Sequence, residues 1–240
     1  MCGILGWYKF GHASQFSETD ASLFNDALKT IHHRGPDAGA VLTVQPNLMF
    51  GHRRLSIIDL SETNNQPFVS RDGNYSLTYN GEIFNYREIR NELVSLGNTF
   101  ATAGDTEVVL QAYAQWGEQC VNRFNGMWAF AIYDRHNRTL FCSRDRFGIK
   151  PFNYYLRDSE LSFCSESKGI LKLYPEKFAP NHLVMGNFLR KTVGAQLEDT
   201  WFEGIKRLMP AHNMVVKDGV VRTYRYWQYP LTTDRQISAK

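Results

Sequence analysis

The 240-residue chain contains no long apolar segment and no run of basic residues longer than a pair. A membrane helix needs roughly 20 consecutive apolar residues, so the sequence predicts no membrane span. The apolar stretch at residues 2–10 is too short for a signal peptide and has no basic residues before it. We therefore expect a soluble, intracellular protein in the cytoplasm.

The chain also has no large excess of positive or negative residues. The 27 Lys and Arg residues nearly balance the 24 Asp and Glu residues, which leaves a net charge of +3. Nucleic-acid binding usually requires a concentrated basic patch, so no nucleic-acid partner is expected. The 43% hydrophobic content is that of a globular chain with a sizeable core.

Cysteine is the third scarce feature. The four cysteines lie far apart and form no CxxC pair; they are Cys2, Cys120, Cys142 and Cys164. This spacing does not match a zinc site, and a disulfide framework is not expected in a chain of this length. We predict no metal site, and we interpret the last three cysteines as small core residues.

Three segments have helical periodicity, at residues 20–33, 85–97 and 105–117. Asp20 is the expected N-terminal cap of the first, and Gly35 with Pro36 its expected stop. Gly97 is the expected C-terminal turn of the second.

Strand signals are more numerous and come mostly in hairpins. They lie at residues 39–44, 48–52, 75–79, 126–134, 139–143, 161–165, 212–216 and 220–227. The turn at Lys217, Asp218 and Gly219 is a strong hairpin signal. Because strands rarely alternate singly with helices, the pattern favours an α+β fold, with antiparallel sheets and helices on their outer faces.

Cys2 is the first candidate for chemistry. A small second residue allows the initiator methionine to be removed, which would place a thiol and a free α-amine on one residue. The amine titrates at roughly 7.7 to 8.0 and is a suitable base for the thiol. The alternative is that residues 2–6 form an ordinary edge strand with a buried cysteine.

Asn80, Gly81 and Glu82 lie where a strand is expected to end and a helix to begin. The Asn80 amide and the Gly81 N–H could be two donors for a developing oxyanion. The alternative is a simple turn, since Asn-Gly is the commonest hairpin pair.

Arg54 and Asp105 are candidates for binding a free amino acid. The planar guanidinium of Arg54 suits a carboxylate, and Asp105 could hold an ammonium group. The alternatives are an ion pair for Arg54 and a helix cap for Asp105.

Two polar loops, at residues 32–37 and 144–152, are interpreted as a structural frame for the site. Their charged residues are expected to pair with one another; they are Arg34, Asp37, Arg144, Asp145 and Arg146.

Taken together and in this order, these segments resemble the glutaminase domain of glutamine-dependent asparagine synthetases, which are class II glutamine amidotransferases and N-terminal nucleophile hydrolases. The segments are Cys2-Gly3, HRGPD, HRRLSIIDL, NGEIFNY, GDTEV, NGMWAFAIYD, RDRFGIKPF and FCSESK. The likeness extends to Trp227. It implies a four-layer αββα sandwich of two antiparallel sheets.

The resemblance also implies roles for individual residues. Cys2 would be the nucleophile, with its own amine as base, and Asn80 and Gly81 would form the oxyanion hole. Arg54, Glu82 and Asp105 would bind L-glutamine, and this half-reaction would need no cofactor.

The chain departs from the family pattern at a few positions. Gly104 stands where many relatives have Ser, Ala211 where Gly is usual, and Asn153 where an aliphatic or aromatic residue is usual. None of these carries a reacting group.

We expect a glutaminase domain at residues 1–230 and, at 231–240, a linker or the start of a synthetase domain. The Ser-Gly-Gly-x-Asp-Ser phosphate loop of the family's ATP-pyrophosphatase domain is absent. That domain, with its ATP and Mg, is the expected partner, in the same native chain or as a separate subunit, and a homodimer is a further expectation. The acceptor is aspartate or another carboxylate such as a sugar acid. Another glutaminase branch, serving an amino-sugar or phosphoribosylamine synthase, and a silent glutamine-binding module are the remaining alternatives.

Overall fold

The computed structural model describes residues 1–11, 15–56, 64–175, 177–190 and 198–229. Residues 57–60 of the HRRLSIIDL segment and the proposed linker at 231–240 lie outside this part of the chain. No helix among the described residues is long and apolar enough to cross a membrane.

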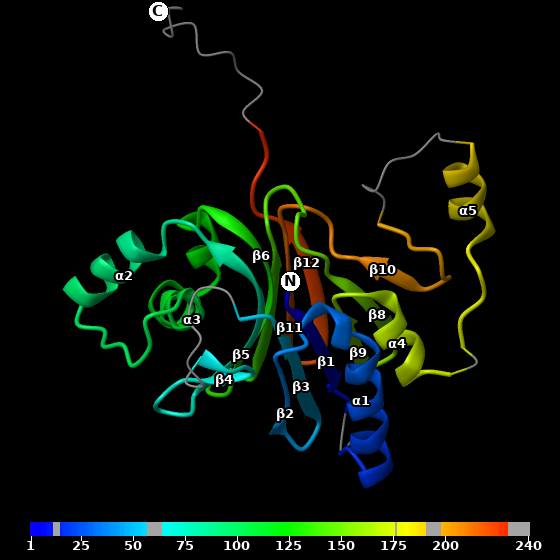
Figure 1. Cartoon of the computed structure of the whole chain (residues 1–240), viewed down its shortest axis with the longest axis horizontal. Coiled ribbons are helices and arrows are strands. Elements are labelled where there is room, and N and C mark those ends of the chain that lie inside the picture. The colour runs from blue at the N-terminus through cyan, green and yellow to red at the C-terminus, as the bar shows by residue number, and fades with distance from the viewer. Residues whose placement is uncertain (12–14, 57–63, 176, 191–197, 230–240) are drawn as a thin grey trace, which may run out of the picture.

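Two six-stranded antiparallel sheets form the centre of the molecule (Figure 1). The first has the order β10-β8-β9-β1-β3-β2. Its strands are β1 (Gly3–Lys9), β2 (Ala38–Gln45), β3 (Leu48–Arg54), β8 (Asn153–Arg157), β9 (Glu160–Cys164) and β10 (Ile205–Arg207).

The second sheet has the order β12-β11-β7-β6-β5-β4. Its strands are β4 (Phe68–Val69), β5 (Tyr75–Ile83), β6 (Gly126–Asp134), β7 (Thr139–Arg144), β11 (His212–Lys217) and β12 (Val220–Arg225). The predicted hairpin turn between β11 and β12 is confirmed, because Asp218 and Gly219 both have positive φ angles, 49° and 78°.

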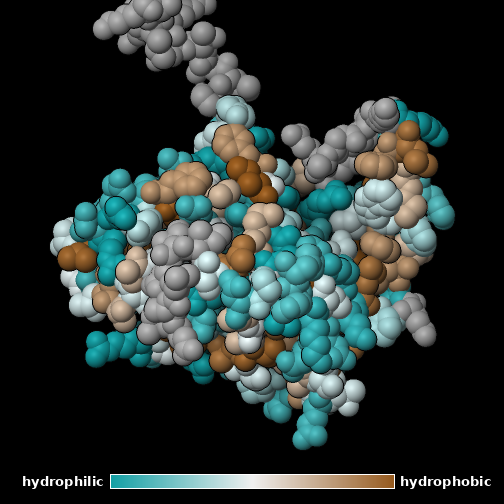
Figure 2. All heavy atoms as spheres, in the orientation of Figure 1, coloured by the Kyte–Doolittle hydropathy of each residue, from teal (hydrophilic) through white to brown (hydrophobic). Residues whose placement is uncertain are grey.

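Helices cover the outer face of each sheet. Helices α1 (Glu18–Thr30) and α4 (Ser167–Leu173) lie on the first sheet, and α2 (Tyr86–Ser95) and α3 (Asp105–Trp116) lie on the second (Figure 1). Short 3-10 turns follow α1 and α3, at His32–Arg34 and Gly117–Asn122. Helix α5 (His182–Leu189) has no buried residue, and its apolar side chains Leu183 and Leu189 are exposed. Figure 2 shows hydrophobic surface in the region of this helix.

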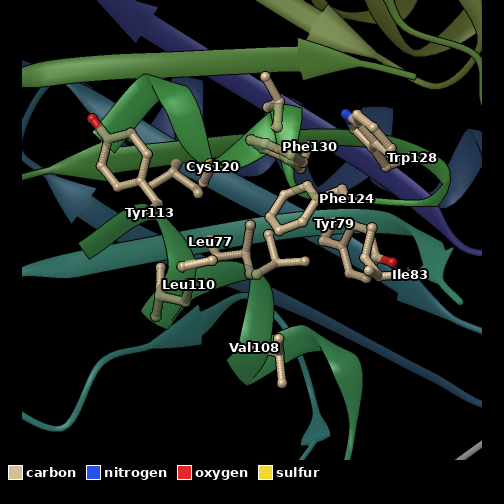
Figure 3. Close-up of a cluster of buried hydrophobic side chains, with 14 of the residues drawn as sticks. Leu77, Tyr79, Ile83, Val108, Leu110, Tyr113, Cys120, Phe124, Trp128 and Phe130 are labelled. Atoms are coloured by element: carbon tan, nitrogen blue, oxygen red, sulfur yellow. The ribbon is translucent and has the colours of Figure 1, made fainter. Parts of the chain in front are cut away.

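Three buried clusters separate the four layers. One joins the first sheet to α1 and α4, one lies between the two sheets, and one joins the second sheet to α2 and α3. In the last cluster, Leu110 and Tyr113 of α3 lie with Leu77 of β5 and Phe130 of β6 (Figure 3). The predicted four-layer αββα arrangement is therefore confirmed.

Strand β1 is buried on both faces and lies between β9 and β3. Ile4 and Tyr8 point into the core between the sheets, and Leu5 and Trp7 point toward the helices. The edge-strand alternative for the N-terminus is wrong. Cys2 directly precedes this strand, so it lies at one end of the sheet's interior.

Local details differ from the sequence prediction in two places. Ser17 caps α1, and Asp20 is its third residue, whose carboxylate accepts a hydrogen bond from the Ser17 backbone N–H. The predicted cap at Asp20 is therefore three residues C-terminal to the actual cap. A capping box has a polar residue at the cap and another at the third helical position, and the sequence pattern did not distinguish them. Strand β5 continues through Asn80-Gly81-Glu82 to Ile83, so these residues are not a turn.

The polar loops act as a frame, but not through mutual ion pairs. Arg34 pairs with Glu166 at 3.0 Å, and Asp37 accepts a hydrogen bond from the Ser56 N–H. Arg144 donates to the backbone carbonyls of Gly148, Lys150 and Leu208, and Arg146 donates to that of Phe124. The predicted pairing among these arginines and aspartates is wrong, because buried backbone groups need partners more than the charges need each other.

Candidate functional site

A cavity of about 360 Å³ lies where the start of β1 meets the end of β5. All six predicted site residues line it: Cys2, Arg54, Asn80, Gly81, Glu82 and Asp105. They come from four separate segments of the chain, and the fold brings them together. The volume suits a small-molecule ligand.

Cys2 carries the accessible thiol of the molecule. Its Sγ accepts a hydrogen bond from the Leu55 N–H at 3.4 Å, and its carbonyl accepts one from Arg34 Nε at 3.0 Å. The other three cysteines are fully buried, and burial raises the pKa of Cys164 to about 12. Their interpretation as core residues is confirmed. Met1 still precedes Cys2 and is itself 53% exposed at the cavity.

Asn80 presents an unsatisfied amide to this cavity. The residue is 1% exposed, and its Nδ2 has no hydrogen-bond partner among the described residues. A buried donor without a partner costs about 1 to 3 kcal/mol, so its presence beside a thiol calls for a ligand oxygen. The next residue, Gly81, leaves no room for a side chain, because a Cβ would lie 2.4 Å from Tyr79 Cε2 and 2.5 Å from the Met127 carbonyl oxygen.

Asp105 is a buried carboxylate at the start of α3. It accepts hydrogen bonds from the Tyr79 hydroxyl at 2.7 Å and from the Ile83 N–H at 3.0 Å. Burial raises the pKa of Asp105, and these two hydrogen bonds oppose the increase. Gly104 occupies the capping position, so the cap alternative for Asp105 is wrong. A cation in the cavity would favour the charged carboxylate.

Arg54, Glu82 and Lys150 are the other charged residues of the lining. Arg54 is 8% exposed, and its Nη1 donates to Asn65 Oδ1 at 2.7 Å. Glu82 is half-buried at the end of β5. The cavity thus has a guanidinium, an ammonium group and two carboxylates around one thiol, and such a mixture of charges suits a zwitterion.

The prediction missed several residues of the cavity wall. Among them are Asn64, Gln66, Tyr79, Thr106 and Lys150. Only Lys150 had a usable signal, since it belongs to the loop that the sequence identified as a frame. Asn64 explains one departure from the family pattern: a Cβ on Gly104 would lie 2.1 Å from Asn64 Nδ2, so glycine at 104 makes space for this wall residue.

Residues 1–227 match the family model described as a glutamine amidotransferase domain. The chain therefore belongs to the glutamine amidotransferase family, in its class II branch. Among its relatives are an asparagine synthetase of Bacillus subtilis, named glutamine-hydrolyzing, with 35% identity over 95% of this chain, and a putative asparagine synthetase of Methanocaldococcus jannaschii, with 42% identity over 71% of it. The protein is a glutamine amidotransferase domain of the asparagine synthetase-like type.

The match covers 36% and 35% of these two relatives, so the chain spans about a third of their length. Among solved structures, the allosteric regulatory enzyme of purine biosynthesis superposes with a TM-score of 0.68, over 95% of this chain and 50% of that one, at 17% identity. The glutamine phosphoribosylpyrophosphate amidotransferase of B. subtilis superposes with a TM-score of 0.67 at 16% identity, over the same shares of the two chains. These likenesses show a shared N-terminal nucleophile hydrolase fold.

Proposed function

We propose that the chain hydrolyses L-glutamine to glutamate and ammonia through a γ-glutamyl thioester on Cys2. The observation that carries this proposal is the juxtaposition of an accessible thiol at residue 2 with the unsatisfied amide of Asn80 in one charged cavity. The relatives named as glutamine-hydrolyzing support it.

Substrate binding follows from the charges. The α-carboxylate of glutamine would bind Arg54, and its ammonium group would bind Asp105 with help from Glu82. Because Asp105 is already held by Tyr79 and Ile83, its carboxylate keeps a defined orientation. The side-chain amide is then free to reach the thiol.

In the proposed chemical steps, the α-amine of Cys2 is the base. Once Met1 is removed, the Cys2 α-amine takes the thiol proton, and the thiolate attacks the amide carbon. Asn80 and the Gly81 N–H stabilise the oxyanion. The C–N bond breaks as the ammonium group of Cys2 returns a proton to the leaving ammonia, and water hydrolyses the thioester to glutamate and regenerates the thiol.

The ammonia would pass to an ATP-pyrophosphatase-type synthetase domain or subunit, which would use ATP and Mg to amidate aspartate. The names of the relatives favour aspartate, and other carboxylates such as sugar acids remain alternative acceptors. A domain at residues 1–230, a homodimer and a cytoplasmic location stay predictions.

The decisive variant is Cys2→Ala, measured by ammonia release from glutamine. We expect complete loss of turnover with an unchanged fold, and the same loss if Met1 is retained. Cys142→Ala is the matched control, since Cys142 is a core residue and should change stability but not turnover. Normal turnover by a Cys2→Ala protein of verified mass would exclude the mechanism. Glutamine binding without ammonia release by the unaltered protein would favour a silent binding module.

Asn80→Ala tests the oxyanion hole. We expect kcat to fall by on the order of a hundredfold or more with a small change in KM, because the lost hydrogen bond forms in the transition state. Asn74→Ala, in an exposed turn, is the control and should keep full turnover. An unchanged kcat for Asn80→Ala would remove this role.

A further inference from the structure

Lys150 is a buried lysine in the wall of the same cavity. It is 6% exposed and lines the cavity together with Cys2. No hydrogen bond or salt bridge joins its ammonium group to any residue that the structure describes. The nitrogen is not among the fully buried side-chain atoms that have no partner, so the charge of a largely buried side chain is open to the cavity.

The backbone around Lys150 is rigidly held. The Asp145 carboxylate is fully buried and accepts hydrogen bonds from the N–H groups of Phe147, Ile149 and Lys150, the last at 2.9 Å. The Lys150 carbonyl accepts one from Arg144 Nε at 2.8 Å. A loop held in this way fixes where the lysine side chain begins, and an incidental surface lysine would not need it.

A negative charge on Cys2 would act on this ammonium more strongly than any other charged group does. Burial lowers the pKa of Lys150, and a charge on Cys2 opposes that decrease more than Glu82 or Asp145 does. Arg34 acts in the opposite sense. A cation near a sulfur atom favours the negative form of that sulfur.

Other charged and titratable groups also lie in the cavity wall or beside Cys2. Two guanidiniums are near, but Arg34 is paired with Glu166 and Arg54 donates to Asn65. Tyr79, Glu82 and Asp105 also line the cavity. Negative charges on the two carboxylates would disfavour a thiolate. Lys150 is therefore the cation whose charge is not already shared within the described part of the wall.

We propose that Lys150 is a positioning residue that acts through Cys2, by stabilising the thiolate form of the sulfur. This inference about Lys150 rests on the proposed function only because it takes Cys2 as the nucleophile. The thiolate, not the thiol, attacks the substrate. The Cys2 amine alternates between base and acid during turnover, whereas the lysine keeps a constant positive charge beside the sulfur.

The test is the pH dependence of Cys2 alkylation by iodoacetamide in the chain without Met1, with adducts located by mass. The three buried cysteines should not react. We expect Lys150→Met to move the midpoint upward by about one pH unit, and Lys150→Arg to restore it. Lys217→Met, at an exposed lysine outside the cavity wall, is the control and should leave it unchanged.

Lys150→Gln is the second variant, in case a methionine disturbs folding. It keeps a polar head group but not the charge, so it should give the same upward shift. The pH dependence of glutamine kcat/KM should move in parallel. Midpoints that equal the unaltered protein's in Lys150→Met and Lys150→Gln would overturn the assignment. Alkylation needs no glutamine, so the two proposals can fail separately. A shifted midpoint without any glutaminase activity would contradict the proposed function and still support the role of Lys150.

Discussion

Ala211 has a positive φ of 59°, a conformation that favours glycine. It is 2% exposed, its N–H donates to the Asp145 carbonyl at 2.9 Å, and its carbonyl accepts from the Tyr226 N–H at 2.9 Å. These bonds hold the residue in place. The positive φ explains why glycine is the usual residue at this position in the family, and Ala211 adopts the same conformation.

This conformation makes a prediction for two substitutions. Ala211→Gly relieves the backbone but loses a buried methyl group and increases the entropy of the unfolded chain, so the free energy of unfolding should change by less than about 1 kcal/mol. Ala211→Val places a β-branched residue at positive φ and should cost more than about 2 kcal/mol. Denaturant unfolding measures both. Equal stability of the two variants would contradict this account.

At the scale of elements, two glycines allow β5 and β6 to approach closely beside the site. A Cβ on Gly81 would lie 2.9 Å from Trp128 Cα, and one on Gly126 would lie 2.2 Å from the Glu82 carbonyl oxygen. The paired residues are Gly81 with Trp128 and Ile83 with Gly126. The glycine of the NGE segment thus has a packing role in addition to its proposed oxyanion role.

Gly81→Ala should therefore lower stability even without substrate. We expect a loss of at least about 2 kcal/mol, since backbone and ring atoms must move, and thermal unfolding would show it. Gly186→Ala is the matched control. A Cβ there contacts nothing within 4 Å, and the residue is inside α5, so stability should be unchanged or higher. Similar melting temperatures for Gly81→Ala and the unaltered chain would show that the strands can separate without cost.

At the scale of the whole molecule, His52 joins the two sheets. It lies in β3 of the first sheet, and its Nε2 is 3.0 Å from the Tyr79 carbonyl oxygen of β5 in the second. The carbonyl can only accept, so we assign the proton to Nε2. Burial lowers the pKa of His52 to about 4, which keeps the ring neutral at pH 7.

The shift predicts a loss of stability in mild acid. Between pH 6.5 and 4 the unfolded chain binds a proton on His52 and the folded chain does not, so stability is full above pH 6.5 and falls as the pH drops toward 4. The total decrease in the free energy of unfolding over this interval is about 3 kcal/mol. Denaturant unfolding at pH 7 and pH 4.5 should show most of it. His52→Gln keeps a donor but cannot titrate, so its loss over the same interval should be smaller by about that amount; an equal loss would refute the assignment.

The sequence alone determined the local features of this protein. Strand and helix periodicity, the glycine turns at Gly97 and Gly219 and the residue types of the site could be read directly, because each depends on neighbours within a few positions. The order of the segments also identified the family. Strands β4, β8 and β10 and helices α4 and α5 were missed, since their short segments carry weak periodic signals.

Only the tertiary structure decided the remaining features. Strand β1 lies between β9 and β3 inside its sheet. Arg34 pairs with Glu166, which is 132 residues away in the sequence. Lys150 lines the same cavity as Cys2. Strand order depends on which distant apolar faces pack together, and a buried charge takes whichever partner that packing brings near. Neither is encoded within one stretch of the chain, so the cavity and its electrostatics follow from the assembled layers.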